Sequence, residues 1–271
     1  MRGSFWSPGP MGRTRGGACW VLVLALASCA PEAPGPRVHA MPAHEGEATS
    51  AAGMVVTGSP YATEAGILML EQGGNAVDAA VAAAFALAVA EPTQSGLGGR
   101  TQILIRMADQ SVLGIDGTTQ VPMGYDSSVA SGGEHGHGAV GIPGTVAALA
   151  AAAERAGTLG LAALVSPAER WAREGLSLPP GEASRLAGVA GDIDPSSEVA
   201  HVFFSADGAP LAAGDALVQP DLGRILADIG RKGAEAFYGG EVARRIAEDM
   251  AAHGGFVTEA DLAGYQAAES E

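Results

Sequence analysis

An arginine next to a glycine-rich turn is a candidate for binding a substrate. The stretch EPTQSGLGGRTQILIR (91–106) begins polar and continues as an apolar strand, and Arg100 stands between the two parts. Gly96, Gly98 and Gly99 have no side chains, which predicts a turn with unusual backbone freedom. The turn is either a corner of the scaffold or, with the guanidinium beside it, a site for an anionic substrate.

A second group of possible ligands lies in the sequence GEHGHG (133–138). Glu134, His135 and His137 carry the carboxylate and imidazole groups that bind metals. No second cluster of such residues supports a metal centre, so we expect a mobile loop. We therefore predict neither a metal nor a cofactor.

Two predicted strands position the arginine. Residues 101–108 and 111–117 are apolar runs separated by a tight turn at 109–110. In a hairpin with that two-residue turn, Arg100 faces Thr119 on the neighbouring strand. Cross-strand neighbours are roughly 5 Å apart, within reach of a long side chain.

Two helices precede this hairpin. Ser59 can cap a helix over 60–72, which Gly-Gly ends. Asn75 can cap a second helix over 76–90, with Asp78 near its positive end. This second helix is apolar on every face but too short for a membrane span, so we expect it to be central and buried.

The remaining pattern mixes strands and helices without a regular repeat. We expect a strand at 51–60, a strand and then a helix within 138–157, a helix starting with a capping box at 166–169, helices near 220–230 and 240–252, and a last helix starting at Thr258 and Asp261. This order favours a layered α+β domain over a Rossmann fold.

The charge balance excludes two classes of partner. The chain of 271 residues has a formal net charge of -15. Such an acidic surface repels nucleic acid and anionic lipid headgroups, so we expect neither as a partner.

The N-terminus is typical of an export signal. Basic residues precede a short apolar run in 1–28, and Leu-Ala-Ser-Cys at 26–29 has the order of a bacterial lipobox. We predict cleavage before Cys29, lipid attachment to its sulfur, a Pro/Ala-rich tether over 29–50 and a folded domain over 51–271. The protein would then be lipid-anchored in a bacterial cell envelope; the alternative is an ordinary signal peptide.

Several motifs in the same order resemble the gamma-glutamyltranspeptidase family. The stretch 53–99 contains GGNAVDAAVA at 73–82, and it is followed by GAVGIPGTVAAL (138–149), LVSPAERWAREGLSL (164–178) and a long match over 217–265. The resemblance covers nearly everything after the tether and corresponds to the large subunit of that family.

The resemblance implies an N-terminal-nucleophile hydrolase with an αββα sandwich, incomplete in this chain. In the family a precursor cuts itself into two subunits, and the new N-terminal threonine of the small subunit attacks gamma-glutamyl amides such as glutathione. This sequence ends before such a threonine. We therefore expect no catalytic residue here, a small-subunit partner from the same precursor, and no activity for this chain alone.

The family binds the donor's α-carboxylate with an arginine in a D-G-R-E-T-A-P motif. Here residues 116–122 read DGTTQVP, so Thr118 replaces that arginine and a neutral hydroxyl replaces a charged fork. We predict that Thr118 and Thr119 contact substrate and that Arg100 supplies the missing guanidinium from the neighbouring strand. The alternatives are solvated threonines and an Arg100–Asp116 ion pair.

The substitution also leaves the function open between three hypotheses. The first is a gamma-glutamyltransferase-like hydrolase. The second is an amidase or acylase of the same fold that acts on another acyl donor. The third is a non-catalytic envelope lipoprotein encoded by a decayed gene.

Overall fold

The computed structural model describes residues 38–42, 49–128 and 136–271. The chain divides into two units, residues 1–35 and 36–271, and every described residue belongs to the second. The helices are α1 (Pro60–Glu71), α2 (Ala76–Ala90), α3 (Thr145–Ala156), α4 (Leu161–Glu174), α5 (Pro180–Val189), α6 (Glu198–Phe203), α7 (Pro220–Lys232), α8 (Glu235–Tyr238), α9 (Gly240–Ala252) and α10 (Glu259–Ala263), with 3-10 turns η1 (His137–Ala139) and η2 (Ala190–Asp192). The strands are β1 (Thr101–Arg106), β2 (Val112–Gly117), β3 (Leu176–Ser177), β4 (Ala216–Leu217) and β5 (Ala268–Ser270).

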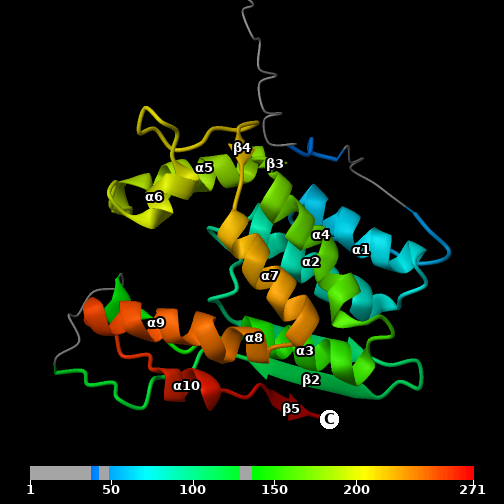
Figure 1. The fold of residues 1–271 in the computed structure, drawn as a ribbon. Coiled ribbons are helices and arrows are strands. Elements are labelled where there is room, and N and C mark those ends of the chain that lie inside the picture. Colours follow the sequence, from blue (N-terminus) through cyan, green and yellow to red (C-terminus); the bar gives the residue numbers. More distant parts are fainter. Residues whose placement is uncertain (1–37, 43–48, 129–135) are drawn as a thin grey trace, which may run out of the picture. The chain divides into compact units, whose positions relative to one another are not determined.

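The larger sheet has the antiparallel order β1-β2-β5 and a helix on one face (Figure 1). Helix α3 packs against β1 and β2. Ile105 and Ile115 are buried on the α3 side, whereas Gln102, Leu104 and Asp116 alternate with the buried residues and are exposed on the other face. The second sheet is the short pair β3-β4. Helices together with antiparallel sheets confirm the predicted α+β class.

Helix α2 lies in a helical layer with α1, α4 and α7, as expected for its apolar surface. Asn75 and Asp78 form a capping box at its start. The fully buried Asp78 carboxylate also reaches the next loop, where it accepts hydrogen bonds from Thr158 Oγ1 (2.6 Å) and from the backbone N–H of Thr158 and Leu159 (both 3.0 Å). Asp78 therefore fixes both a helix start and a loop far away in sequence.

The predicted register of the β1–β2 hairpin is wrong by one residue. Gln110 adopts a left-handed backbone conformation (φ 75°), and Met107 N–H donates to Ser111 O at 2.9 Å, so the turn contains one more residue than expected. Thr101 consequently pairs with Gly117. Continued one step further, this register sets Arg100 opposite Thr118 rather than Thr119.

Two predicted strands are absent from the described residues. Residues 51–59 form no ladder, and within 138–142 only Ile142 makes a bridge, with Gln120. A strand needs a partner as well as an apolar sequence, and in the described residues the bridge of Ile142 is the only β-pairing that either stretch makes.

The predicted capping box at 166–169 is also wrong, because α4 begins earlier, at Leu161. Pro167 lies inside the helix and has no N–H to donate to the carbonyl of Ala163. Ser166 Oγ donates to that carbonyl instead, at 3.0 Å. The Ser-Pro pair therefore continues the helix rather than starting it.

The C-terminal helices follow the sequence pattern. Helices α7 and α9 contain the predicted ranges, and Thr258 and Asp261 form the capping box of α10. The pattern did not predict α5, α6 or α8, of which α6 and α8 have only 6 and 4 residues.

Candidate substrate-binding site

Arg100, Gln102 and Thr118 line one open pocket of about 450 Å³ at the end of the β1–β2 hairpin. The structure thus places Arg100 and Thr118 at one pocket, through the shifted register, and their contact with a substrate stays a prediction. Gln102 was not predicted, but its place two residues after Arg100 puts it on the same face of β1. A guanidinium and an amide in one pocket can bind a carboxylate.

Thr119 does not line this pocket. It is half-buried, and its Cβ lies against Gly141 in the segment that bridges to Gln120. The structure therefore does not bring Thr119 together with Arg100.

Hydrogen bonds with Asp116 and Tyr265 fix the position of Thr118. Its N–H donates to Asp116 Oδ1 at 2.9 Å and its hydroxyl donates to the same oxygen, whereas its carbonyl accepts a 2.8 Å hydrogen bond from the Tyr265 hydroxyl. The two bonds from Thr118 hold the pKa of Asp116 below its usual range. Both bonds end on one oxygen of Asp116, and among the described residues Asp116 forms no ion pair with Arg100, the alternative considered above.

Tyr265 and Tyr238 form a stacked pair behind this site. Their ring centroids are 5.5 Å apart and the rings are nearly parallel, at 7°. Tyr238 donates to Pro143 O at 2.9 Å and accepts from Ala147 N–H at 3.2 Å. Burial, followed by the Asp116 charge, raises the pKa of Tyr265, which favours the protonated hydroxyl that donates to the Thr118 carbonyl.

Two glycines allow β2 to approach the start of α3. A Cβ on Gly117 would lie 2.6 Å from Ala148 Cβ and 2.7 Å from Gly144 O. A Cβ on Gly144 would overlap the Gly117 carbonyl and the Tyr265 hydroxyl far inside van der Waals contact. This close approach fixes the backbone just before Thr118.

The glycine-rich turn is tied to the same helix start. The Gly99 carbonyl accepts from Gly144 N–H at 2.9 Å and from Thr145 N–H at 3.3 Å. Contrary to our expectation, Gly96, Gly98 and Gly99 do not adopt left-handed backbone conformations. Hydrogen bonds of the Gly99 carbonyl therefore tie the turn to α3; an added Cβ would be crowded at Gly99, 3.2 Å from Gly96 O, but not at Gly98, where nothing lies within 4 Å.

A buried carboxylate anchors the beginning of this turn. Glu182 is 1% exposed and accepts hydrogen bonds from Thr93 N–H and Thr93 Oγ1, both at 2.8 Å. Arg185 neutralises it at 3.0 Å and also reaches Glu91 at 3.3 Å. The sequence offered only a Glu and an Arg three residues apart on a helix, which is too common a pattern to identify an anchor.

The other candidate residues fall into two groups. Cys29, Glu134 and His135 lie outside the described residues. His137 is described, and it lies in η1 rather than in the pocket.

Comparison with known proteins agrees with this architecture. A family model for gamma-glutamyltranspeptidase matches residues 62–271. The glutathione hydrolase proenzyme of Escherichia coli (strain K12) is 37% identical over 228 residues, which cover 80% of this chain and 39% of that protein. The Acylase ACY 1 proenzyme of Pseudomonas sp. (strain SE83) is 36% identical over 248 residues, covering 86% of this chain and 44% of that protein.

The crystal structure of Helicobacter pylori gamma-glutamyltranspeptidase superimposes with a TM-score of 0.76 at 32% identity, covering 83% of this chain and 67% of that chain. The chain spans about two fifths of the length of the curated relatives. The fold is that of the N-terminal-nucleophile hydrolases. Because the family match extends over most of the described residues, this chain belongs to the gamma-glutamyltranspeptidase family.

Proposed function

We propose that this chain is the large-subunit part of a gamma-glutamyltransferase-like hydrolase that acts on gamma-glutamyl amides such as glutathione. A small subunit from the same precursor would supply the threonine nucleophile, and the α-amine of that threonine would be its general base. The acyl group would then pass to water or to an acceptor amine. The family match supports this proposal, and both curated relatives compared above are named proenzymes.

The observation that carries the proposal is the pocket shared by Arg100, Gln102 and Thr118. In the proposed complex Arg100 binds the donor's α-carboxylate and the Gln102 amide adds a neutral hydrogen bond, while Thr118, whose hydroxyl donates to Asp116, leaves the space that the family arginine would fill. A charged fork directly before β1 then does what the arginine of the family motif does at position 118.

A second candidate is an amidase or acylase that acts on a different acyl donor. Thr118 in place of the family arginine favours it, as does the 36% identity to a protein named as an acylase. The non-catalytic lipoprotein stays as the third hypothesis.

The DNA downstream of codon 271 tests the enzymatic proposals. We expect an in-frame segment with a threonine at a self-cleavage junction, and an expressed product that separates into two subunits and hydrolyses a gamma-glutamyl anilide. This chain expressed alone should show no turnover. An immediate stop codon would instead support the non-catalytic protein, and a processed product that hydrolyses only other acyl amides would support the acylase.

We further propose that Cys29 carries a lipid that anchors the protein in the cell envelope, after removal of residues 1–28. In the described residues, no helix is long and apolar enough to cross a membrane. Two or more acyl chains suffice for stable anchoring. Cys29→Ala should move the protein from the membrane fraction to the soluble fraction on ultracentrifugation, and unchanged sedimentation with membranes would contradict the anchor.

A further inference from the structure

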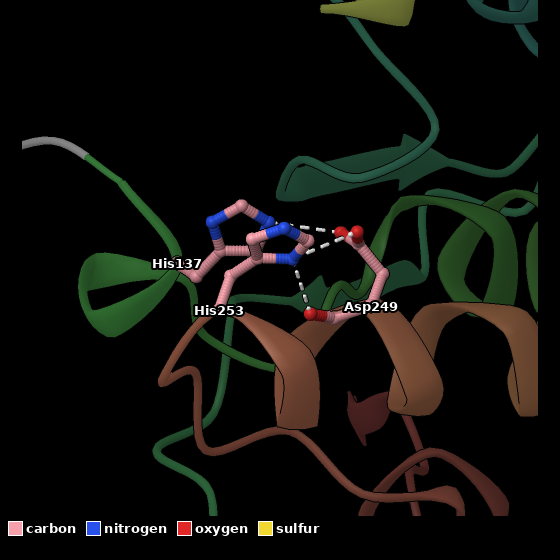
Figure 2. A group of neighbouring side chains, drawn as sticks. All are labelled: His137, Asp249 and His253. Atoms are coloured by element: carbon pink, nitrogen blue, oxygen red, sulfur yellow. Dashed lines mark hydrogen bonds and ion pairs between the residues drawn. The ribbon is translucent and has the colours of Figure 1, made fainter.

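Two histidines and an aspartate meet at the end of α9, outside the candidate substrate pocket (Figure 2). His137 Nε2 lies 2.9 Å from Asp249 Oδ2, and His253 Nδ1 lies 3.1 Å from Asp249 Oδ1. The two imidazole rings are stacked, with centroids 4.6 Å apart. One nitrogen of each ring and a carboxylate oxygen all lie within 4.8 Å of one another.

The backbone explains why these side chains meet. Asp249 and His253 are four residues apart at the C-terminal end of α9, so they share one side of the helix. His137 comes from η1, which packs closely on the turn after α9: a Cβ on Gly255 would lie 3.1 Å from the His137 carbonyl. The third ligand is therefore brought in by tertiary packing, from a segment more than a hundred residues earlier.

The donor set suits a borderline divalent cation. Neutral imidazole nitrogens and a carboxylate oxygen are the ligands of three-residue zinc sites, in which water completes the coordination. His253 Nδ1 lies 2.8 Å from the backbone carbonyl of Asp249. Donation of its proton to that carbonyl leaves the lone pair on Nε2, and such a bond orients a ligating histidine.

We propose that His137, Asp249 and His253 form a binding site for a Zn²⁺-like divalent cation. The side chains are 35%, 55% and 56% exposed, which leaves open positions for water and a direct path for the ion. A helix C-terminus favours positive charge, and the net charge of -15 raises the local concentration of cations.

Such an ion would cross-link η1 and the C-terminal end of α9. Ile142 follows η1 by three residues and bridges to Gln120, two residues beyond Thr118. The ion would therefore stabilise a segment that ends beside the candidate substrate site, without supplying chemistry to that site. The role is structural and does not depend on the proposed enzymatic activity.

Titration of the full chain with Zn²⁺ tests the site. The protein is purified without a polyhistidine tag, treated with a chelator and dialysed before calorimetry. We expect one ion per chain, a higher melting temperature with Zn²⁺, and reversal by the chelator. His137→Asn, Asp249→Asn and His253→Asn should each weaken binding by at least about tenfold, since even the loss of groups that orient metal ligands costs that much.

His201→Asn is the matched control. His201 is also exposed and also lies near an acidic residue on its own helix, Glu198, at 3.5 Å, but it belongs to no such cluster in the described residues. The control should bind Zn²⁺ as the unchanged protein does. Absence of binding by the unchanged protein, or equal binding by the His137→Asn/His253→Asn double variant with an unchanged circular dichroism spectrum, would overturn the proposal.

Discussion

At the scale of single residues, the candidate site combines a lost charge and a gained one. Thr118 stands where the family motif has arginine, and Arg100 lines the same pocket from the neighbouring strand. To bind the acyl donor as the family arginine does, the Arg100 guanidinium needs to reach nearly the position that an arginine side chain at residue 118 would occupy. Its origin from a different strand is compatible with this requirement because a long side chain spans adjacent strands.

Substitution of Arg100 by glutamine should test this role in the processed two-subunit enzyme. A charge-assisted contact contributes about 1.5–3 kcal/mol, so KM for a donor with a free α-carboxylate should rise about tenfold or more. KM for an uncharged acyl amide should stay constant. Arg106→Gln, on the same face of β1 at its other end, is the control and should change neither value; equal effects of both variants would contradict the assignment.

Asp78 offers a test of stability at the same scale. Burial raises the pKa of Asp78, but the hydrogen bonds from Thr158, Asn75 and Leu159 outweigh burial and lower the pKa overall. Because the folded-state value is below the unfolded value of about 3.9, the ionised carboxylate stabilises the fold above that pH. This stabilisation is lost as the pH falls through the folded-state pKa.

Asp78→Asn should therefore lower the free energy of unfolding by about 1.5–3 kcal/mol at pH 7. The difference from the unchanged protein should shrink below about pH 4 as the native carboxylate becomes protonated. Urea denaturation at several pH values measures both effects. Asp192→Asn, at an exposed position, should change the free energy of unfolding by less than about 0.5 kcal/mol at every pH; a pH-independent loss in the Asp78 variant would refute the linkage.

Local signals explain which details the sequence could predict. The capping boxes of α2 and α10 need only residues within one turn, so Asn75, Asp78, Thr258 and Asp261 were identified correctly. The hydrogen bond from Tyr265 to the Thr118 carbonyl joins residues 147 apart, and no periodicity reports such a contact. Arg100 was singled out because it follows a glycine-rich turn, and its role in binding a substrate stays a prediction.

At the scale of elements, the site depends on how closely β2 and α3 approach each other. Gly117 and Gly144 meet backbone to backbone, and Tyr265 closes the contact over them. The sequence predicted both elements but not this contact, because the sequence does not show that Gly117 and Gly144 lie against each other. The hairpin register failed for a related reason: Gln110 adopts a conformation that glutamine rarely takes.

Gly144→Ala should disrupt this contact. The added methyl group overlaps backbone atoms that cannot rotate away, so we expect a loss of about 1–3 kcal/mol in the free energy of unfolding. Backbone amide hydrogen exchange should also become faster around Thr118. Gly98→Ala is the control, because nothing lies within 4 Å of its added Cβ; similar losses in both variants would show that the close approach has no special role.

At the scale of the whole described unit, the three-stranded sheet is covered on one face only. Helix α3 packs on the side of Ile105 and Ile115, whereas Leu104 on the other face is 79% exposed, in an edge strand. In an αββα sandwich a second sheet stacks on such a face. The proposed small subunit would provide that sheet and would bury Leu104 in the two-subunit assembly.

Without a partner, the exposed face and the free edge of β1 should make the 271-residue chain self-associate. We expect the average mass from sedimentation velocity to rise with protein concentration. Leu104→Lys should weaken this association about tenfold or more, because burial of a leucine side chain contributes about 1.5–3 kcal/mol and a lysine on an edge strand opposes pairing.

Val56→Lys separates this effect from a general gain in solubility. Val56 is 83% exposed and lies outside the sheets, so the same substitution there adds the same charge without changing the sheet face. It should leave the association unchanged. A second experiment expresses the chain together with the small-subunit segment. The small subunit should then cover the sheet face, so self-association should disappear. Leu104→Lys should impair the assembly of the two subunits. A chain that stays monomeric at all concentrations, or that responds equally to both lysines, would contradict the uncovered face as the cause.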